Sequence, residues 1–170
     1  MALIKKIKEK APEWGEGCWL ADNATLVGDV VMGKNCTVWF NAVVRGDVHY
    51  IRIGDNTNIQ DGAIIHCTYQ KSPTVIGSNV SIAHHALVHG CTIKDNVLIG
   101  MGAIVMDNAI INEGSVIAAG AVILPGTFVE ENSIYAGVPA KKIKDTGAEM
   151  LAVIKRTANN YPMYASWYKE

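Results

Sequence analysis

Residues 93–135 of the chain read IKDNVL-IGMGAI-VMDNAI-INEGSV-IAAGAV-ILPGTF-VEENSI-Y when they are divided into groups of six. Every complete group begins with Ile or Val, carries Gly or Asn at its fourth position, and has a small or compact residue at its fifth. Gly and Asn accept left-handed backbone angles, so the fourth position predicts a corner every six residues. Short extended segments between corners would close a triangular coil, and successive coils would stack as parallel strands about 4.8 Å apart.

The same register extends toward the N-terminus as far as Leu20 and gives 19 units, with Gly, Asn or Asp at the fourth position in 15 of them. The irregularities are extra residues before Ile53, an insertion over 68–74, and one residue fewer between Val88 and Ile93. A β-sandwich, the main alternative, would need longer strands and hairpin turns and would show no six-residue period. We therefore expect one all-β domain, a parallel β-helix of hexapeptide repeats over about 12–140, with a helical tail over 145–169.

A row of apolar residues at the sixth position points outward and needs a cover. Its members in the regular stretch are Leu98, Ile104, Ile110, Val116, Val122, Phe128 and Ile134. The tail could supply this cover, because Met150, Leu151 and Ile154 recur at helical spacing. A neighbouring subunit could also supply it, and a three-sided prism is suited to a threefold ring. The C-terminal aromatic residues could pack on either surface.

The composition excludes several classes of protein. The 170 residues carry a formal net charge of −1, which gives no electrostatic support for binding to nucleic acid or to an anionic membrane. The sequence has no run of about 18 apolar residues, and its start reaches Lys5 and Lys6 without the apolar core of a signal peptide. The four cysteines show no CxxC spacing, so we expect a reduced, cytoplasmic setting.

Three of the five histidines fall in register on the repeat. His66 and His89 both occupy the second, outward position, one coil apart, so their imidazoles can converge on one metal ion. His84 lies at the third position on the preceding side, where it would reach the ion of a neighbouring subunit. The pattern predicts a metal site between subunits whose three neutral histidines leave a coordination position for water, as in a catalytic zinc site. His85 falls at a corner, where we expect a structural role.

Further polar residues fall near these histidines. Arg45 occupies the column of His66, one coil earlier, and Asp61 shares the column of His84. We expect Arg45 to pair across the interface with Asp61 or with Asp47 of the neighbour, although Asp47 also fits a corner position like that of Asp29. Gln60 points outward on the side next to the histidines. It could orient a metal-bound water, or it could be a solvated strand residue.

Four segments resemble the gamma-class carbonic anhydrase family: VRGD at 44–47, NIQDG at 58–62, His66, and HHALVHG at 84–90. The closing stretch YAGVPAK at 135–141 is similar too, but hexapeptide acyltransferases share it. The resemblance covers about residues 10–145. It implies a left-handed β-helix and a homotrimer with zinc, or sometimes iron or cobalt, at each interface. It also implies that His66 and His89 come from one subunit and His84 from the next.

The same resemblance implies roles for the neighbouring polar residues. Arg45, Asp47 and Asp61 would tie the interface together and line the site, and Asn58 and Gln60 would position the metal-bound water and the substrate. The implied reaction is the reversible hydration of carbon dioxide to bicarbonate by a zinc-bound hydroxide.

Two positions depart from the archetypal enzymes. Val48 stands where those enzymes have a glutamate, and the loop at 67–74 contains no acid, although theirs holds a proton-shuttling glutamate. We therefore expect low carbon dioxide hydration activity. Two other functions remain open on this fold: an acyl-coenzyme A transferase that uses a basic histidine without metal, and a non-catalytic scaffold in which the metal only clamps the trimer.

Overall fold

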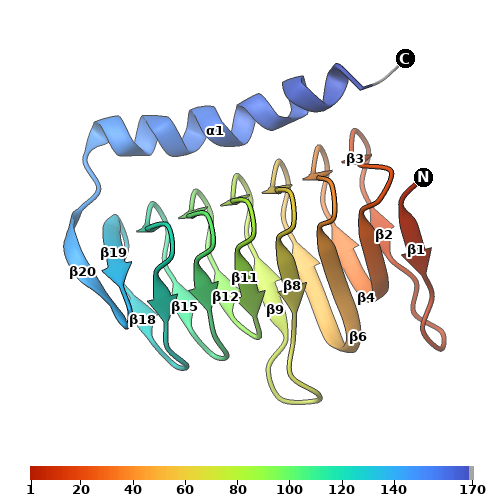
Figure 1. Cartoon of the computed structure of the whole chain (residues 1–170), viewed down its shortest axis with the longest axis horizontal. Helices are drawn as coiled ribbons and strands as arrows, with labels where there is room; N and C mark the ends of the chain where they lie inside the picture. The colour runs from red at the N-terminus through yellow and green to blue at the C-terminus, as the bar shows by residue number, and fades with distance from the viewer. Residues whose placement is uncertain (169–170) are drawn as a thin grey trace.

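The computed structural model describes residues 1–168 and shows a β-helix whose coils stack along one axis, with one long helix lying along the stack (Figure 1). The strands form a 12-stranded and an 8-stranded sheet, and among the described residues every pair of strands is parallel except β19–β20. The 12-stranded sheet folds around one edge of the prism because β4 and β6 are long enough to run along two of its faces.

The bounds of the strands follow the predicted units. The 12-stranded sheet contains β1 (Leu3–Lys5), β2 (Glu13–Trp14), β4 (Thr25–Met32), β6 (Val43–Ile53), β8 (Ile64–His66), β9 (Thr74–Ile76), β11 (Leu87–His89), β12 (Thr92–Ile93), β14 (Ile104–Val105), β15 (Ile110–Ile111), β17 (Val122–Ile123) and β18 (Phe128–Val129). The 8-stranded sheet contains β3 (Trp19–Leu20), β5 (Thr37–Val38), β7 (Asn58–Ile59), β10 (Ser81–Ile82), β13 (Leu98–Ile99), β16 (Val116–Ile117), β19 (Ser133–Gly137) and β20 (Ala140–Asp145).

The core confirms the six-residue register. Ile82 pairs with Ile59 on one side and with Ile99 on the other, so residues three units apart are stacked neighbours. Of the 19 residues that open the predicted units, all except Leu20 are buried. Leu20 lies on β3, the edge strand of its sheet, and is therefore covered on one side only. The core is a column of stacked aliphatic side chains.

The corners lie where the sequence predicts them, with three exceptions. Twelve of the 15 Gly, Asn or Asp positions have φ between +50° and +71°, and His85 has φ +57°, as a corner residue requires. Asp29 and Asp47 do not, because β4 and β6 continue through them. The left-handed residue is instead Gly28, which pairs with Gly46 so closely that a Cβ on Gly28 would lie 2.4 Å from the Gly46 carbonyl oxygen. The prediction of corners at these two aspartates was wrong, and Asn23 is the third exception.

The insertion at 68–74 leaves the register of the coils intact. It projects from the prism between β8 and β9 (Figure 1), and Thr68 and Ser72 close its base through an antiparallel bridge. As a result, β8 and β11 pair directly, as if the inserted residues were absent. This pairing is the condition on which the predicted stacking of His66 and His89 depends.

Helix α1 (Ala148–Ser166) returns along the prism toward the first coils (Figure 1). Ile154 is buried against Val116 and Ile134, which confirms that the tail covers part of the outward apolar row. Near the end of α1, aromatic residues pack on the first coils, with the rings of Tyr161 and Trp39 5.3 Å apart and those of Tyr168 and Trp19 also 5.3 Å apart. Within residues 1–168, no helix is long and apolar enough to span a bilayer.

The helix covers only one of the three faces. The outward residues of the other two faces keep exposed apolar surface, with Ile64 43% exposed, Ile110 38% and Phe128 62%. The tail of a single chain therefore does not cover the whole row.

Candidate metal centre

His66 and His89 lie side by side, as predicted. They are paired residues of the parallel strands β8 and β11, and their ring centroids are 5.1 Å apart. His66 Nδ1 lies 3.2 Å from His89 Nε2. Two nitrogens bound to one zinc ion at 2.0–2.1 Å in tetrahedral geometry lie about 3.3–3.4 Å apart. The pair therefore has the spacing that a shared metal requires.

The other ring nitrogen of each histidine is held by a carboxylate. His66 Nε2 lies 3.1 Å from Asp47 Oδ1, and His89 Nδ1 lies 2.5 Å from Asp107 Oδ1. Because an ionised carboxylate only accepts, it selects the tautomer that is protonated on the nitrogen facing it. In the neutral rings, the two nitrogens that face each other then both carry lone pairs. A cation between them resolves this arrangement, and a carboxylate behind a histidine is the usual support of a metal ligand.

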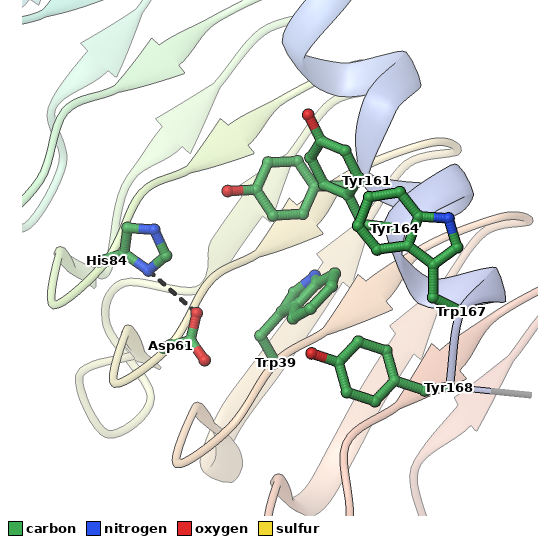
Figure 2. A pocket seen from close by; sticks show the side chains of 7 residues that line it. All are labelled: Trp39, Asp61, His84, Tyr161, Tyr164, Trp167 and Tyr168. Atoms are coloured by element: carbon green, nitrogen blue, oxygen red, sulfur yellow. Dashed lines mark ion pairs between the residues drawn. The ribbon is translucent and has the colours of Figure 1, made fainter.

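His84 shows the same support but lies elsewhere on the chain. Its Nδ1 is 3.0 Å from Asp61 Oδ2, as the dashed line in Figure 2 marks. Residues 1–168 of one chain contain no group of three His, Cys, Asp or Glu side chains placed to hold a metal together. His84 must therefore reach the ion of another copy if it is to act as the third ligand.

Asp107 is the residue that the sequence reading missed. It stands one coil after Gly90, and a Cβ on Gly90 would lie 2.4 Å from Asp107 Oδ1. The absence of a side chain at Gly90 leaves room for the carboxylate to reach His89. The second oxygen of Asp107 accepts a hydrogen bond from Thr68 Oγ1 at 2.5 Å, so Asp107 joins the inserted loop to the histidine pair. The sequence did contain a signal for this role. Asp107 falls one coil after Gly90, and Gly90 directly follows the predicted ligand His89.

Arg45 and Asp47 form an ion pair within one chain, with Nη1 and Oδ2 2.6 Å apart. Burial alone would raise the pKa of Asp47, but hydrogen bonds from Arg45 and His66 outweigh it and lower this pKa below its ordinary value. Burial also lowers the pKa of His66, which favours the neutral ring. The pKa of Asp107 is likewise lowered, because hydrogen bonds from Thr68 and His89 outweigh burial. These aspartates are therefore ionised and accept bonds from the histidines near neutral pH.

Asn58 and Gln60 lie on the face that α1 crosses, and both are buried. Gln60 Nε2 donates to Asn58 Oδ1 at 2.9 Å, and Asn58 Nδ2 donates to Ser81 Oγ at 2.8 Å. Gln60 is therefore not a solvated strand residue, since its side chain belongs to an ordered chain of hydrogen bonds.

An aromatic cavity of about 440 Å³ opens beside His84 and Asp61, between the prism and the end of α1 (Figure 2). Its other lining residues are Trp39, Tyr161, Tyr164, Trp167 and Tyr168. Burial, with a smaller contribution from the charge of Asp61, raises the pKa of Tyr161 to about 12, so this phenol is a neutral hydrogen-bond donor. The cavity gives the third histidine an apolar setting with a few polar groups, which is typical of small-molecule sites.

Known proteins are similar to this chain in sequence and in fold. A family described as "Bacterial transferase hexapeptide (six repeats)" matches residues 15–46 and 90–125. "Probable carbonic anhydrase" of Methanocaldococcus jannaschii is 52% identical over 142 residues, covering 84% of this chain and 89% of that protein. "Gamma carbonic anhydrase 3, mitochondrial" of Arabidopsis thaliana is 42% identical, covering 93% of this chain and 63% of the plant protein.

A solved structure from Bacillus cereus, described as that of a candidate acetyltransferase, superposes with a TM-score of 0.95 at 37% identity and covers 99% of this chain and 97% of that one. Relatives described as transferases and relatives named as carbonic anhydrases therefore share this fold, which hosts more than one activity. The two relatives named as carbonic anhydrases match 84% and 93% of this chain. The chain belongs to the gamma-class carbonic anhydrase-like family of hexapeptide-repeat proteins.

Proposed function

We propose that the chain forms a homotrimer that holds a divalent metal between subunits and catalyses the reversible hydration of carbon dioxide to bicarbonate. Zinc is the proposed metal, with iron or cobalt as alternatives, and the proposed setting is the cytoplasm. The ligands would be His66 and His89 of one subunit and His84 of the next. The observation that carries the proposal is that each of these three imidazoles is held through one ring nitrogen by its own carboxylate. This support leaves one nitrogen of each ring available to a metal.

The apolar surface supports the trimer. Ile64 lies beside His66 on β8, and Leu87, Ile104 and Val122 follow it on the next strands of the same face. Helix α1 does not cover this face, and Ile64 is exposed. In a threefold ring, the histidine face of one subunit would meet the His84 edge of the next, so one contact would bury the apolar row and complete the metal site.

A bound metal would supply a Lewis acid that lets water ionise near neutral pH. The residues of the chain would prepare the site for it. Asp47, Asp61 and Asp107 fix the tautomer of their histidines, and Arg45 keeps Asp47 charged and in place. Gln60 and Asn58, which are hydrogen-bonded to each other, would help to position water and substrate from the buried side of the site. The aromatic wall beside His84 would offer carbon dioxide an apolar approach.

Proton export is the expected weak step. Val48 supplies no carboxylate, and the loop over 67–74 contains no acid. Asp107 lies close to the loop, but its two oxygens are engaged by His89 and Thr68. Turnover should therefore be slow and should rise with the concentration of an added imidazole buffer, which replaces the missing shuttle.

The function is tested by reconstituting the trimer anaerobically with zinc, iron or cobalt and measuring carbon dioxide hydration by stopped flow. The proposal expects metal-dependent hydration at one ion per interface. A fully loaded trimer that shows no hydration with any of the three metals contradicts the enzymatic part.

The same preparation separates the two alternatives. The close superposition on a structure described as that of a candidate acetyltransferase favours testing acyl transfer. An acyltransferase would be stabilised by acetyl-coenzyme A and would contain no metal after purification. A metal-clamped scaffold would keep its metal but show no hydration, and His84→Ala would dissociate the trimer without loss of an activity.

Asp107→Asn is expected to lower the affinity of the trimer for zinc by about 10–100-fold, because loss of a carboxylate behind a ligating histidine has effects of this size. The asparagine keeps the shape of the side chain but removes the charge that orients His89. Metal affinity is measured by competition with a chelator. Asp95→Asn is the matched control, since Asp95 accepts a backbone bond from Ser78 and contacts no histidine. Equal affinities of the two variants would show that Asp107 has no supporting role.

A further inference from the structure

Cys18 and Cys36 stack in adjacent coils, away from the metal centre. Each immediately precedes one member of the parallel pair Trp19–Thr37, so the two cysteines face each other across β3 and β5. The backbone bond from Trp19 N to Cys36 O, 2.9 Å long, fixes this register. Neighbouring parallel strands lie about 4.8 Å apart, which is within the 4.4–6.8 Å between Cα atoms that a disulfide spans.

The two thiols differ in access. Cys36 is fully buried in the core, whereas Cys18 is half-buried and immediately precedes β3, the edge strand of the 8-stranded sheet. Only one coil stacks on β3 in that sheet, so the Cys18 sulfur is the more accessible of the two. A small molecule can therefore reach the Cys18 sulfur before it reaches the buried Cys36 sulfur.

The surroundings of Cys18 stabilise a thiolate. The backbone N–H of Cys36 donates to Cys18 Sγ at 3.3 Å, while the Cys18 thiol donates to Gly33 O and the Cys36 thiol to Gly54 O, both at 3.1 Å. The pKa of Cys18 is lowered to about 7, chiefly by the Cys36 thiol and also by the backbone N–H of Cys36. Burial and the nearby charge of Asp55 oppose this shift. By contrast, the contact with Cys18 and burial raise the pKa of Cys36, which stays a protonated thiol. Burial also raises the pKa of Cys67, and it raises the pKa of Cys91 to about 12.

We propose that Cys18 and Cys36 form a peroxide-sensitive dithiol that closes to a disulfide between the first two coils. The Cys18 thiolate would attack one oxygen of hydrogen peroxide, giving a sulfenic acid and releasing hydroxide. The Cys36 thiol would then pass its proton to the leaving hydroxide while its sulfur attacks the sulfenic sulfur, so that the S–S bond forms and one water is released. The peroxide is reduced and the two thiols are oxidised, so electrons and atoms balance. The proposal does not depend on the metal or on the reaction at the histidines.

The test treats the intact 170-residue chain with hydrogen peroxide, followed by thiol counting and non-reducing peptide mapping. We expect two of the four thiols to be lost, a Cys18–Cys36 cross-linked peptide to form, and dithiothreitol to reverse both changes. In Cys36→Ser, a dimedone adduct should collect on Cys18, and Cys67→Ser, the matched control, should behave like the wild type. Before oxidation, iodoacetamide should label Cys18 at least about tenfold faster than Cys91 at neutral pH.

Three results would overturn the proposal. One is four free thiols in the wild type after a peroxide dose that oxidises free glutathione. Another is a wild-type map in which Cys18 is oxidised but is not joined to Cys36. The third is a disulfide between the Cys18 residues of two copies. Each result is read on the wild-type protein, so a variant that fails to fold does not affect the decision.

Discussion

Purified His89→Ala is expected to contain almost no metal, falling from about one ion per subunit to below about 0.1, and to hydrate carbon dioxide at the background rate. His89 Nε2 faces His66 Nδ1 at 3.2 Å, so the substitution removes half of the pair on which the site is built. It also leaves Asp107 without the ring that it orients. The measurements are metal content by mass spectrometry and hydration by stopped flow, on protein expressed with zinc, iron or cobalt.

His85→Asn is the matched control. It removes one histidine from the same segment, and asparagine readily adopts the left-handed conformation that position 85 requires, with φ +57°. This variant should keep its metal and its activity. Retention of one ion per subunit by His89→Ala, in a trimer as stable as the wild type, would show that the histidine pair is not the metal site.

The repeat region could be predicted in detail because its period is short and strict. A buried residue every six positions and a left-handed residue three positions later define both the coil and its register, so the pairing of His66 with His89 followed by counting. The exceptions arose from a close backbone contact. Gly28 and Gly46 lie so close together that two long strands bend there without corners at Asp29 and Asp47. The expectation of a corner at the fourth position of every unit does not detect this contact.

The parts of the site that the sequence did not reveal depend on contacts between distant segments. Gln60 is buried on the face that α1 crosses, and a repeat pattern carries no information about the path of that helix. Asp107 becomes relevant only because Gly90 leaves space above His89. The Arg45–Asp47 pair forms within the chain, although the sequence suggested a contact with a neighbour. Local patterns place the ligands, and tertiary packing determines what supports them.

Mixed trimers test whether the third ligand comes from another subunit. His84→Ala and His89→Ala homotrimers should each lack metal, because every site in them has lost one ligand. In a random one-to-one mixture assembled by co-expression, a site is intact when a His84→Ala subunit supplies the histidine pair and a His89→Ala subunit supplies His84. This combination occurs at about a quarter of the interfaces, so about a quarter of the wild-type metal content and activity should return.

The mixture distinguishes a shared site from a site within one chain. If all three ligands belonged to one subunit, every subunit in the mixture would lack a ligand, and no metal would return. A mixture of His66→Ala with His89→Ala is the matched control, because both substitutions damage the same half of the interface and no pairing of these subunits restores it. Recovery in the first mixture and none in the second requires His84 to come from a different subunit from His66 and His89. Equal recovery in both mixtures, or none in either, would contradict the proposed centre.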